Sequence, residues 1–565
     1  ALVMNWERDT GILPDVVVEL YACLPNSCEG QDLQQLFSSL TLPANLTLPR
    51  VSCQKDEDIS TDAAAIVSIC VLGLLGLLMV IGTAYDITHR KDTDSEDPYI
   101  SGVEAKENEG FELQEPKTVE VDGEAITSST LARILLAFSL PRNSQRILSV
   151  DVAPDTVRCL HGIRVLSIGW LILGYTLYFM SVYFENSLGA AEALEEVAGQ
   201  VVIHSTLAVD TFFVVSGCLT AILFVREAVA EDGIKSKNVF FYFVHRFIRL
   251  TPAYAITIMA LTCLLPYMSD GPNWTRDSRA YYSNCNKYWW TNLLYINNFY
   301  SSLKDQCIPW SWYLSVDMQF HWIVAPFIII PLAAGAVSKS VYQRIIGGVL
   351  IGGLVFLQIF LTIYFEEDVN GDFLRHSDDF QWEIFQKPYC RAAPYVLGLG
   401  FGYALACLEG LLWLCSLTVI FAATFVKINE NRVMLDDPFH WSHGVRSAHE
   451  AIYRPLFSLA ISVVVYLCAT GNGGFINSIL SWRGFLPFSR LTYCIFLLHP
   501  AVILADQWQA RVPVYFHLSY VAQRAAGYFV ITAIFAYVLS VTVEAPITAL
   551  ERVLFKRKRI QSTNM

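Results

Sequence analysis

The stretch VVIHSTLAVDTFFVVSGCLTAILFV, residues 201–225, is a long apolar run that carries an acidic residue, Asp210, well inside it. A second run, IRVLSIGWLILGYTLYFMSVY at residues 163–183, carries Arg164 near its start. About 20 mostly apolar residues are enough for a helix to cross the hydrocarbon core of a bilayer. A charge at that depth costs about 2.5–3.5 kcal/mol on insertion scales, so it usually faces the interior of a helix bundle and marks a functional site. These two runs predict a helical membrane protein with polar groups in its interior.

Runs of the same kind recur along the chain and predict an all-α polytopic membrane protein with about eleven transmembrane helices. The region 392–426 is almost continuously apolar and too long for one span, so either two helices meet in a very tight turn or a loop is missing there. The expected spans are 63–85, 163–183, 200–225, 250–268, 314–335, 345–365, 393–408, 410–426, 452–470, 485–504 and 522–544.

The composition agrees with a membrane protein. Of the 565 residues, 54% are hydrophobic and only 16% are charged, whereas a soluble protein carries about 25% charged residues. Much of the net charge of −13 comes from the acidic segment 92–124, which reads as a solvated linker. No basic nucleic-acid motif and no zinc-ligand spacing is present, so we expect neither a nucleic-acid partner nor a metal. The chain starts without an initiator Met or a signal-like stretch, which is typical of a processed or an incomplete N-terminus.

The polar segment 1–60 carries three cysteines, Cys23, Cys28 and Cys53, and a glycosylation sequon at Asn45. Cysteines in a short polar segment indicate an oxidising compartment, and their odd number suggests a missing partner. Residues 87–157 are charged and poor in aromatics, which is typical of a cytoplasmic linker that is mostly disordered. Within it, the piece 131–148 could form one amphipathic helix on the membrane surface.

Charge sets the expected orientation, because Lys and Arg favour short cytoplasmic loops. With the cysteine-bearing start outside, eleven crossings leave the basic tail 551–565 in the cytoplasm. The same count places the sequon at Asn273 outside, together with Cys285 and Cys307, which we expect to form a disulfide. We read the four tryptophans of that loop as interfacial belt residues: Trp289, Trp290, Trp310 and Trp312. The count also puts one basic loop inside, with Arg226, Lys235, Lys237, Arg246 and Arg249.

The polar residues inside the expected spans can be grouped by their depth in the membrane. Tyr175 lies eleven residues after Arg164, about 16 Å deeper at the helical rise. Asp210 enters the next span from the opposite side and reaches a similar height, and His499 lies in the outer third of the tenth span. These three residues form one candidate polar site within the membrane. A structural ion pair for Asp210, or a merely buried His499, remains the plainer alternative.

Arginines form a second candidate site at the cytoplasmic ends of the spans. Arg164, Arg246 and Arg249 would line a cationic mouth suited to phosphates, because a guanidinium group forms forked, charge-assisted hydrogen bonds. The plainer interpretation is that these arginines follow the positive-inside bias and snorkel to the interface.

Ordered motifs carry a resemblance to a known family. The chain resembles the acyltransferase 3 family, and more narrowly its animal "nose resistant to fluoxetine" branch, over nearly its whole length. The segment CLPNSCEGQDLQQLF resembles the end of the cysteine-rich extracellular domain of that branch. The strings that carry the family resemblance are LHGIRVLSIGWLILGYT, VDTFFVVSGCLT, HRFIRLTPAY, WSWYLSVDMQF, YCRAAPYVLGLGFGY, LSWRGFLPFSRLTYCIFLLHP and VEAPITALE.

The resemblance implies a domain organisation. Residues 1–60 would be the remnant of the cysteine-rich extracellular domain and 61–86 a preceding transmembrane helix. Residues 158–550 would form the ten-helix acyltransferase bundle. The protein would then be a multi-pass protein of the plasma membrane or a secretory-pathway membrane, glycosylated at Asn45 and Asn273.

The resemblance also implies an activity. Such a protein transfers an acyl group from cytoplasmic acyl-CoA, its donor substrate, to a hydroxyl on a lipid or carbohydrate acceptor. The family's hallmark is an Arg, ten residues, and then a His that serves as the base. Arg164 matches the Arg, but Tyr175 stands at the His position, and a phenol with a pKa of about 10 is a poor base at neutral pH. We therefore expect Tyr175, Asp210 and His499 near the transferred group and Arg164, Arg246 and Arg249 on the CoA phosphates.

The departure at Tyr175 keeps two other functions open. The first is a non-catalytic family member that binds or transports lipids or small hydrophobic compounds through the same cavity. The second is an ion-coupled transporter that uses Asp210, although the repeated halves common in transporters are not evident.

Overall fold

The computed structural model describes residues 2–6, 18–22, 52–53, 59–90, 130–151, 156–186, 189–190, 193–194, 196–269, 274–300, 306–369, 380–407, 420 and 442–555. Three short strands, β1 (Leu2–Trp6), β2 (Val18–Ala22) and β3 (Ser52–Cys53), form an antiparallel sheet of order β2-β1-β3. Strand β1 is central, since Leu2 lies opposite both Ala22 and Cys53.

Helices make up the main body of the described chain. The long helices are α2 (Ala63–Arg90), α5 (Cys159–Met180), α8 (Leu207–Ala230), α9 (Ser236–Cys263), α14 (Ala325–Val337), α15 (Val341–Val369), α17 (Ala392–Cys407), α20 (His443–Ala469), α22 (Phe485–Gln509) and α23 (Leu518–Leu539). The shorter helices are α3 (Thr130–Ala137), α4 (Leu140–Leu148), α7 (Val197–Ile203), α10 (Trp274–Tyr282), α11 (Cys285–Leu293), α12 (Asn297–Tyr300), α13 (Trp312–Gln319), α21 (Gly474–Leu480) and α24 (Ala545–Phe555).

The fold class expected from the sequence is confirmed. Eight described helical stretches are long and apolar enough to cross a membrane, and they coincide with eight of the eleven expected spans. The expected span 393–408 corresponds to a shorter apolar helix, Ala392–Leu405, and the span 250–268 falls largely within α9. The span 410–426 lies outside the described residues apart from position 420, so the total of eleven stays a prediction.

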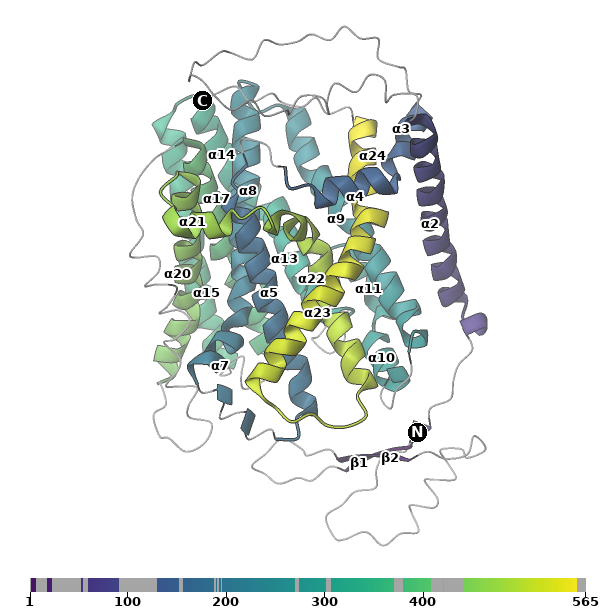
Figure 1. The fold of residues 1–565 in the computed structure, drawn as a ribbon. Helices are drawn as coiled ribbons and strands as arrows, with labels where there is room; N and C mark the ends of the chain where they lie inside the picture. Colours follow the sequence, from purple (N-terminus) through teal and green to yellow (C-terminus); the bar gives the residue numbers. More distant parts are fainter. Residues whose placement is uncertain are drawn as a thin grey trace, which may run out of the picture.

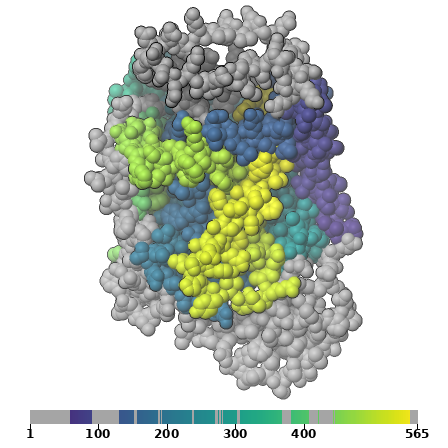
Figure 2. All heavy atoms as spheres, viewed as in Figure 1, coloured from purple at the N-terminus to yellow at the C-terminus, as the bar shows by residue number. Residues whose placement is uncertain are grey.

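The long helices run side by side and define two ends of the bundle (Figure 1). We call the upper end in that view, which carries α4 and α24, the α4 end, and the lower end, with α7 and α10, the α10 end. Helix α8 lies at the centre, because 83% of its most apolar window is buried, whereas only 11% of that of α2 is buried. Figure 2 shows α2 along one edge of the molecule. The peripheral helix α2 therefore has most of its surface available to lipid.

Small residues bring α8 and α17 into backbone contact. A Cβ atom at Gly217 would lie 2.2 Å from the carbonyl oxygen of Tyr395, and one at Gly398 would lie 2.3 Å from that of Val214. No side chain larger than hydrogen fits at such a separation, so glycine is required at both positions. This close pairing fixes the depth of α8, and with it Asp210, relative to the residues that precede α17.

Helix α9 begins earlier than the sequence pattern predicts. It starts at Ser236 rather than near 250, so Arg246 and Arg249 lie within the helix and not in a basic loop. Only the short turn from Glu231 to Lys235 separates α9 from α8. The expected boundary was wrong because arginines were counted as loop residues, although carboxylates from other helices neutralise them inside the bundle.

The amphipathic piece 131–148 forms two helices, α3 and α4, rather than the single helix expected. Ser139 separates them as the N-cap of α4, and Pro141 favours the first turn of a new helix. The cap residue also donates a hydrogen bond to Asp86 of α2 at 2.6 Å, and Arg142 Nε donates to the same carboxylate at 2.8 Å. The two short helices are thus attached to the end of α2.

Two of the four tryptophans read as an interfacial belt are buried instead. Trp310 and Trp312 are each only 3% exposed, and the indole of Trp310 donates a hydrogen bond to the carbonyl of Leu497 at 3.2 Å. Trp289 remains exposed. The belt interpretation was wrong for the two residues of the short segment that enters α13, since that segment turns into the bundle rather than along its surface.

Candidate functional site

Arg246 of α9 lies in a buried polar cluster with residues of α8 and α13. It forms an ion pair with Asp317, and its Nη2 donates to Ser216 Oγ at 2.9 Å, while that hydroxyl donates to Asp317 Oδ1 at 2.7 Å. Arg246 Nη1 also lies 3.4 Å from Nδ1 of His321. The other ring nitrogen of His321 lies 3.2 Å from the carbonyl of Tyr242, which can only accept, so Nε2 carries the proton and Nδ1 faces the arginine as an acceptor. The cluster therefore holds Arg246 in one position.

Arg249, one helical turn further along α9, is held less tightly. Its guanidinium lies 3.8 Å from Glu544 Oε1, and its side chain is 50% exposed. The carboxylate of Glu544 is itself buried and accepts hydrogen bonds from Ser540 at 3.0 Å and from Cys494 at 3.4 Å. Arg249 is thus available to a ligand, whereas its counter-charge is fixed.

Arg164 of α5 completes the group of arginines. Its side chain forms no hydrogen bond or ion pair with the residues that the structure describes, but its charge interacts with those of Arg249 and Arg246. Asp317 and Glu544 neutralise two of the three guanidinium groups, so one positive charge is left over. The structure therefore brings the three predicted arginines together into one cationic cluster, which we call the arginine cluster.

Tyr175 and His499 lie in contact deeper in the bundle. Their ring centroids are 5.0 Å apart and the rings are nearly perpendicular. The Nδ1 atom of the buried imidazole lies 2.9 Å and 3.2 Å from the carbonyl oxygens of Phe496 and Ile495, so it must carry the proton. This leaves Nε2 with a free lone pair, and it has no hydrogen-bond partner among the described residues. An imidazole fixed in this tautomer can accept a proton.

Asp210 does not join Tyr175 in the structure but pairs with two arginines. Its carboxylate accepts hydrogen bonds from Arg391 Nη1 at 2.9 Å and from Arg454 Nη1 at 2.8 Å, and it is fully buried. Arg391 Nε also donates to the carbonyl of Phe385 at 3.0 Å, and both guanidinium groups lie over the ring of that residue. Such a fully desolvated arrangement is typical of a structural ion-pair network.

Sequence reasoning missed Arg391 and Arg454, although a signal was present. Arg454 falls inside the expected span 452–470, and Arg391 lies two residues before the span 393–408. An arginine in an apolar span needs a buried carboxylate, and Asp210 was the acidic residue at comparable depth.

A π-helical turn lies next to Arg246, Arg249 and Arg391. Such a turn is a local widening of a helix that often occurs at functional sites. The turn Phe320–Val324 contains His321 beside Arg246, and Ser540–Glu544 ends at the partner of Arg249. The third turn, Gln381–Phe385, supplies the carbonyl that binds Arg391. The three turns therefore shape the backbone at the groups that hold the arginines.

The remaining predicted residues lie at the α10 end or outside the described chain. Cys285 and Cys307 form a disulfide, which joins the start of α11 to the segment before α13. Asn45 and Asn273, the two sequon residues, lie outside the described residues, as do Cys23 and Cys28. Within the described ranges, no group of three or more His, Cys, Asp or Glu side chains is placed to hold a metal ion.

Comparison with known proteins defines the class of this polytopic helical protein. Residues 157–545, which include the arginine cluster, Tyr175 and His499, match the family model described as an acyltransferase domain. The chain therefore belongs to this acyltransferase family, as the sequence motifs indicated.

Two relatives from Caenorhabditis elegans refine the comparison. The chain is 26% identical to "Nose resistant to fluoxetine protein 6" over 596 aligned residues, which cover 97% of this chain and 68% of the relative. It is 23% identical to "Regulator of hypoxia-inducible factor 1" over 68% of this chain and 78% of that relative. No solved structure matches the chain.

Proposed function

We propose that the protein is a membrane-embedded O-acyltransferase, which moves an acyl group from acyl-CoA to a hydroxyl on a lipid or carbohydrate. One observation carries the proposal. Helix α5 bears Arg164 in the arginine cluster and, eleven residues deeper, Tyr175, whose ring contacts His499. The Nε2 atom of that imidazole has no hydrogen-bond partner among the described residues. The arginine cluster would bind the phosphates and His499 of α22 would be the base, so the two ends of an acyl-CoA donor would lie at two levels along α5.

The arginine cluster would bind the phosphates of the donor. A surplus positive charge in a partly dehydrated site attracts phosphate, and guanidinium groups bind it through paired hydrogen bonds. Arg249 and Arg164 are the members with bonding capacity left, since Arg246 is held by Asp317 and Ser216. We place this cluster, and with it the α4 end of the bundle, on the cytoplasmic side, where acyl-CoA is found.

His499 would act as the general base. Its Nε2 would accept the proton of the acceptor hydroxyl while the hydroxyl oxygen attacks the thioester carbonyl. Collapse of the tetrahedral intermediate would form the ester and release the CoA thiolate, which takes up the proton as it leaves. A positioned base of this kind contributes about 10²–10⁴-fold to the rate.

Tyr175 would orient the imidazole rather than replace it. Its ring packs nearly perpendicular to that of His499, and its hydroxyl donates no hydrogen bond to a described residue. That hydroxyl is available to the oxygen on which negative charge develops during the reaction. Asp210, paired with Arg391 and Arg454, would support the site without touching the reacting atoms.

The same proposal covers the setting of the protein. We place it in the plasma membrane or a secretory-pathway membrane, with its N-terminus outside, its C-terminus in the cytoplasm and glycans at Asn45 and Asn273. The basic C-terminal segment and the disulfide at the α10 end support this orientation. Enzymatic removal of N-glycans from the intact protein in sealed vesicles tests it.

Transfer of a labelled acyl group tests the activity. The purified full chain in lipid nanodiscs is incubated with labelled acyl-CoA and a membrane extract that supplies acceptors. We expect labelled ester products from the wild type and a loss of about 100-fold or more in His499→Ala. The exposed histidine variant His517→Ala, at the start of α23, serves as the matched control.

Absence of transfer and of acyl-CoA hydrolysis in the wild type would reject the enzyme. If the protein then still bound acyl-CoA or lipid, it would be the non-catalytic family member, and Tyr175→His would be the variant in which turnover should emerge.

A further inference from the structure

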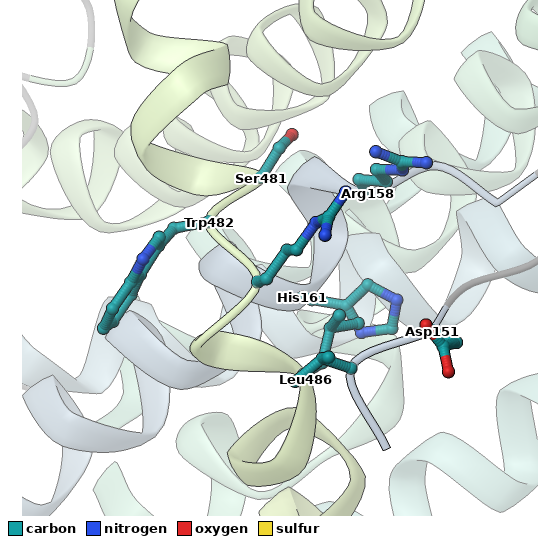
Figure 3. A pocket seen from close by; sticks show the side chains of 8 residues that line it. Asp151, Arg158, His161, Ser481, Trp482 and Leu486 are labelled. Atoms are coloured by element: carbon teal, nitrogen blue, oxygen red, sulfur yellow. The ribbon is translucent and has the colours of Figure 1, made fainter. Parts of the chain in front are cut away.

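A pocket of about 140 Å³ opens at the α4 end of the bundle, next to the arginine cluster. Three parts of the chain line it: the segment after α4, the start of α5 and the turn between α21 and α22. The lining residues are Val150, Asp151, Arg158, His161, Ser481, Trp482, Arg483 and Leu486. Figure 3 shows Trp482 on one side of the pocket and His161 and Asp151 on the other.

Unused hydrogen-bond donors and acceptors surround this pocket. Arg158 and Arg483 are exposed, and neither side chain forms a hydrogen bond or ion pair with a described residue. The Nδ1 atom of His161 lies 2.8 Å from Ser489 Oγ. Its other ring nitrogen, Nε2, is buried and has no hydrogen-bond partner in the described chain. Three nitrogen-bearing side chains therefore have bonding capacity left for a ligand.

The charge of the pocket is positive. Asp151 also lines it, but its charge interacts with that of Arg490, whose guanidinium is bound to the carbonyls of Arg146, Ile147 and Asp151. Among the described residues, Arg158 and Arg483 are thus left without a carboxylate partner. The first turn of α5, which begins at Cys159, adds the partial positive charge of a helix N-terminus.

Close backbone packing gives the pocket a fixed shape. A Cβ atom at Gly162 would lie 2.2 Å from the carbonyl oxygen of Leu480, so α5 touches the end of α21 directly. A Cβ at Gly484 would lie 2.6 Å from the ring of Trp482, which therefore lies over that glycine. The indole is 63% exposed, and it presents a flat aromatic surface beside two guanidinium groups.

The geometry points to a binding site for a phosphate monoester on an aromatic-bearing molecule. Resting on the proposed function, we assign it to the 3′-phosphate and adenine end of the donor acyl-CoA. The volume is below the roughly 300–1,000 Å³ of a pocket that encloses a whole drug-sized ligand, so it suits one end of a long molecule. The two arginines would bind the phosphate and Trp482 would stack on the base.

The position of the pocket agrees with this assignment. His161 lies one helical turn before Arg164 on α5. A donor held by its terminal phosphate in the pocket would therefore pass its diphosphate over the arginine cluster. Its pantetheine arm would then run along α5 toward Tyr175 and His499.

Comparison of CoA with 3′-dephospho-CoA tests the site. Binding of each to the full chain is measured by calorimetry in nanodiscs of phosphatidylcholine alone. We expect CoA to bind about tenfold more tightly than dephospho-CoA. One charge-assisted hydrogen bond to the 3′-phosphate is enough to lower the dissociation constant by about that factor. The double variant Arg158→Gln/Arg483→Gln should lose this preference and still bind dephospho-CoA, whereas Arg511→Gln, an exposed arginine at the other end of the bundle, should keep it.

Each contrary result has a separate meaning. Equal binding of the two nucleotides, unchanged by the double variant, overturns the pocket assignment and leaves the proposed acyl-CoA-dependent function standing. Absence of any CoA binding by the wild type overturns the proposed function and the assignment with it.

A second arm uses nanodiscs that contain phosphatidylinositol 4,5-bisphosphate, whose headgroup carries the same phosphate monoester. Lipid binding that depends on Arg158 and Arg483, without a preference for CoA over dephospho-CoA, overturns the donor assignment in favour of a lipid headgroup. The donor assignment is supported if CoA binds more tightly than dephospho-CoA and lipid binding does not depend on Arg158 and Arg483.

Discussion

The rings of Tyr175 and His499 pack nearly perpendicular to each other, with 5.0 Å between the centroids and 85° between the planes. The family pattern has a histidine at the position of Tyr175, with ten residues between it and the motif arginine. In this protein an imidazole still stands next to that position, but it comes from α22 instead of α5. The substitution of histidine by tyrosine on one helix therefore leaves a proton acceptor in the same part of the bundle.

The hydroxyl of Tyr175 can be separated from its ring by two substitutions. Tyr175→Phe keeps the ring contact and removes an oxygen that bonds to no described residue, so the free energy of unfolding should change by less than about 0.5 kcal/mol. We expect kcat to fall while KM for acyl-CoA is kept, because the lost hydrogen bond would form only in the transition state. Tyr175→Leu should additionally lower stability by about 1 kcal/mol, since the aromatic contact is lost. Wild-type kcat in Tyr175→Phe would show that the residue serves only packing.

Asp210 should matter for stability more than for chemistry. Asp210→Asn removes the buried charge that pairs with both Arg391 and Arg454, which should destabilise the protein by about 3–5 kcal/mol. Thermal unfolding of the purified protein in detergent, followed by fluorescence, measures the loss. Glu231→Gln breaks a partly exposed pair with Lys235 at the surface and should cost no more than about 1 kcal/mol. Equal melting temperatures for the two variants would contradict a structural role for Asp210.

Apolar periodicity was sufficient to predict most of the helices, because the bilayer imposes the same length on every span. Apolar periodicity failed to predict the helix boundary where charged residues lie inside a helix. The arginines of α9 were assigned to a loop because the carboxylates that pair with them are far away in the sequence. Asp317, for example, lies 71 positions after Arg246. Trp310 and Trp312 were assigned to the interface for a similar reason. Their burial depends on how a loop folds back onto α22, and local sequence does not encode that.

The candidate site was predictable only in part. The three arginines and the depth of Tyr175 follow from spacing along single helices. The partners do not, because they depend on the rotation and depth of neighbouring helices. Asp210 and Tyr175 share a similar height by residue counting, but α8 presents Asp210 to Arg391 and Arg454, whereas α5 presents Tyr175 to His499.

Arg246 and Arg249 should respond differently to the same substitution. Arg246→Gln leaves the buried carboxylate of Asp317 unpaired and should lower stability by about 3 kcal/mol. Arg249→Gln should cost at most about 1 kcal/mol, because that side chain is half exposed and lies 3.8 Å from its partner. It should instead raise KM for acyl-CoA, and the difference from the wild type should shrink as salt is added. Melting temperatures and KM at two salt concentrations distinguish the two roles. An unchanged KM in a stable Arg249→Gln protein would remove this residue from the donor site.

Asp86 should control how firmly α4 is held against the end of α2. Its buried carboxylate accepts hydrogen bonds from Ser139 at 2.6 Å and from Arg142 at 2.8 Å, so Asp86→Ala should cost about 1.5–3 kcal/mol of local stability. Because α4 also packs on α22, the loss should appear as faster amide hydrogen exchange in residues 140–148. Arg142→Ala removes only the half-exposed partner and should have the smaller effect, and a double-mutant cycle of the two gives their interaction energy. If exchange in α4 were as slow in Asp86→Ala as in the wild type, packing on α22 and on the π-helical turn Ser540–Glu544 would be enough to hold the helix.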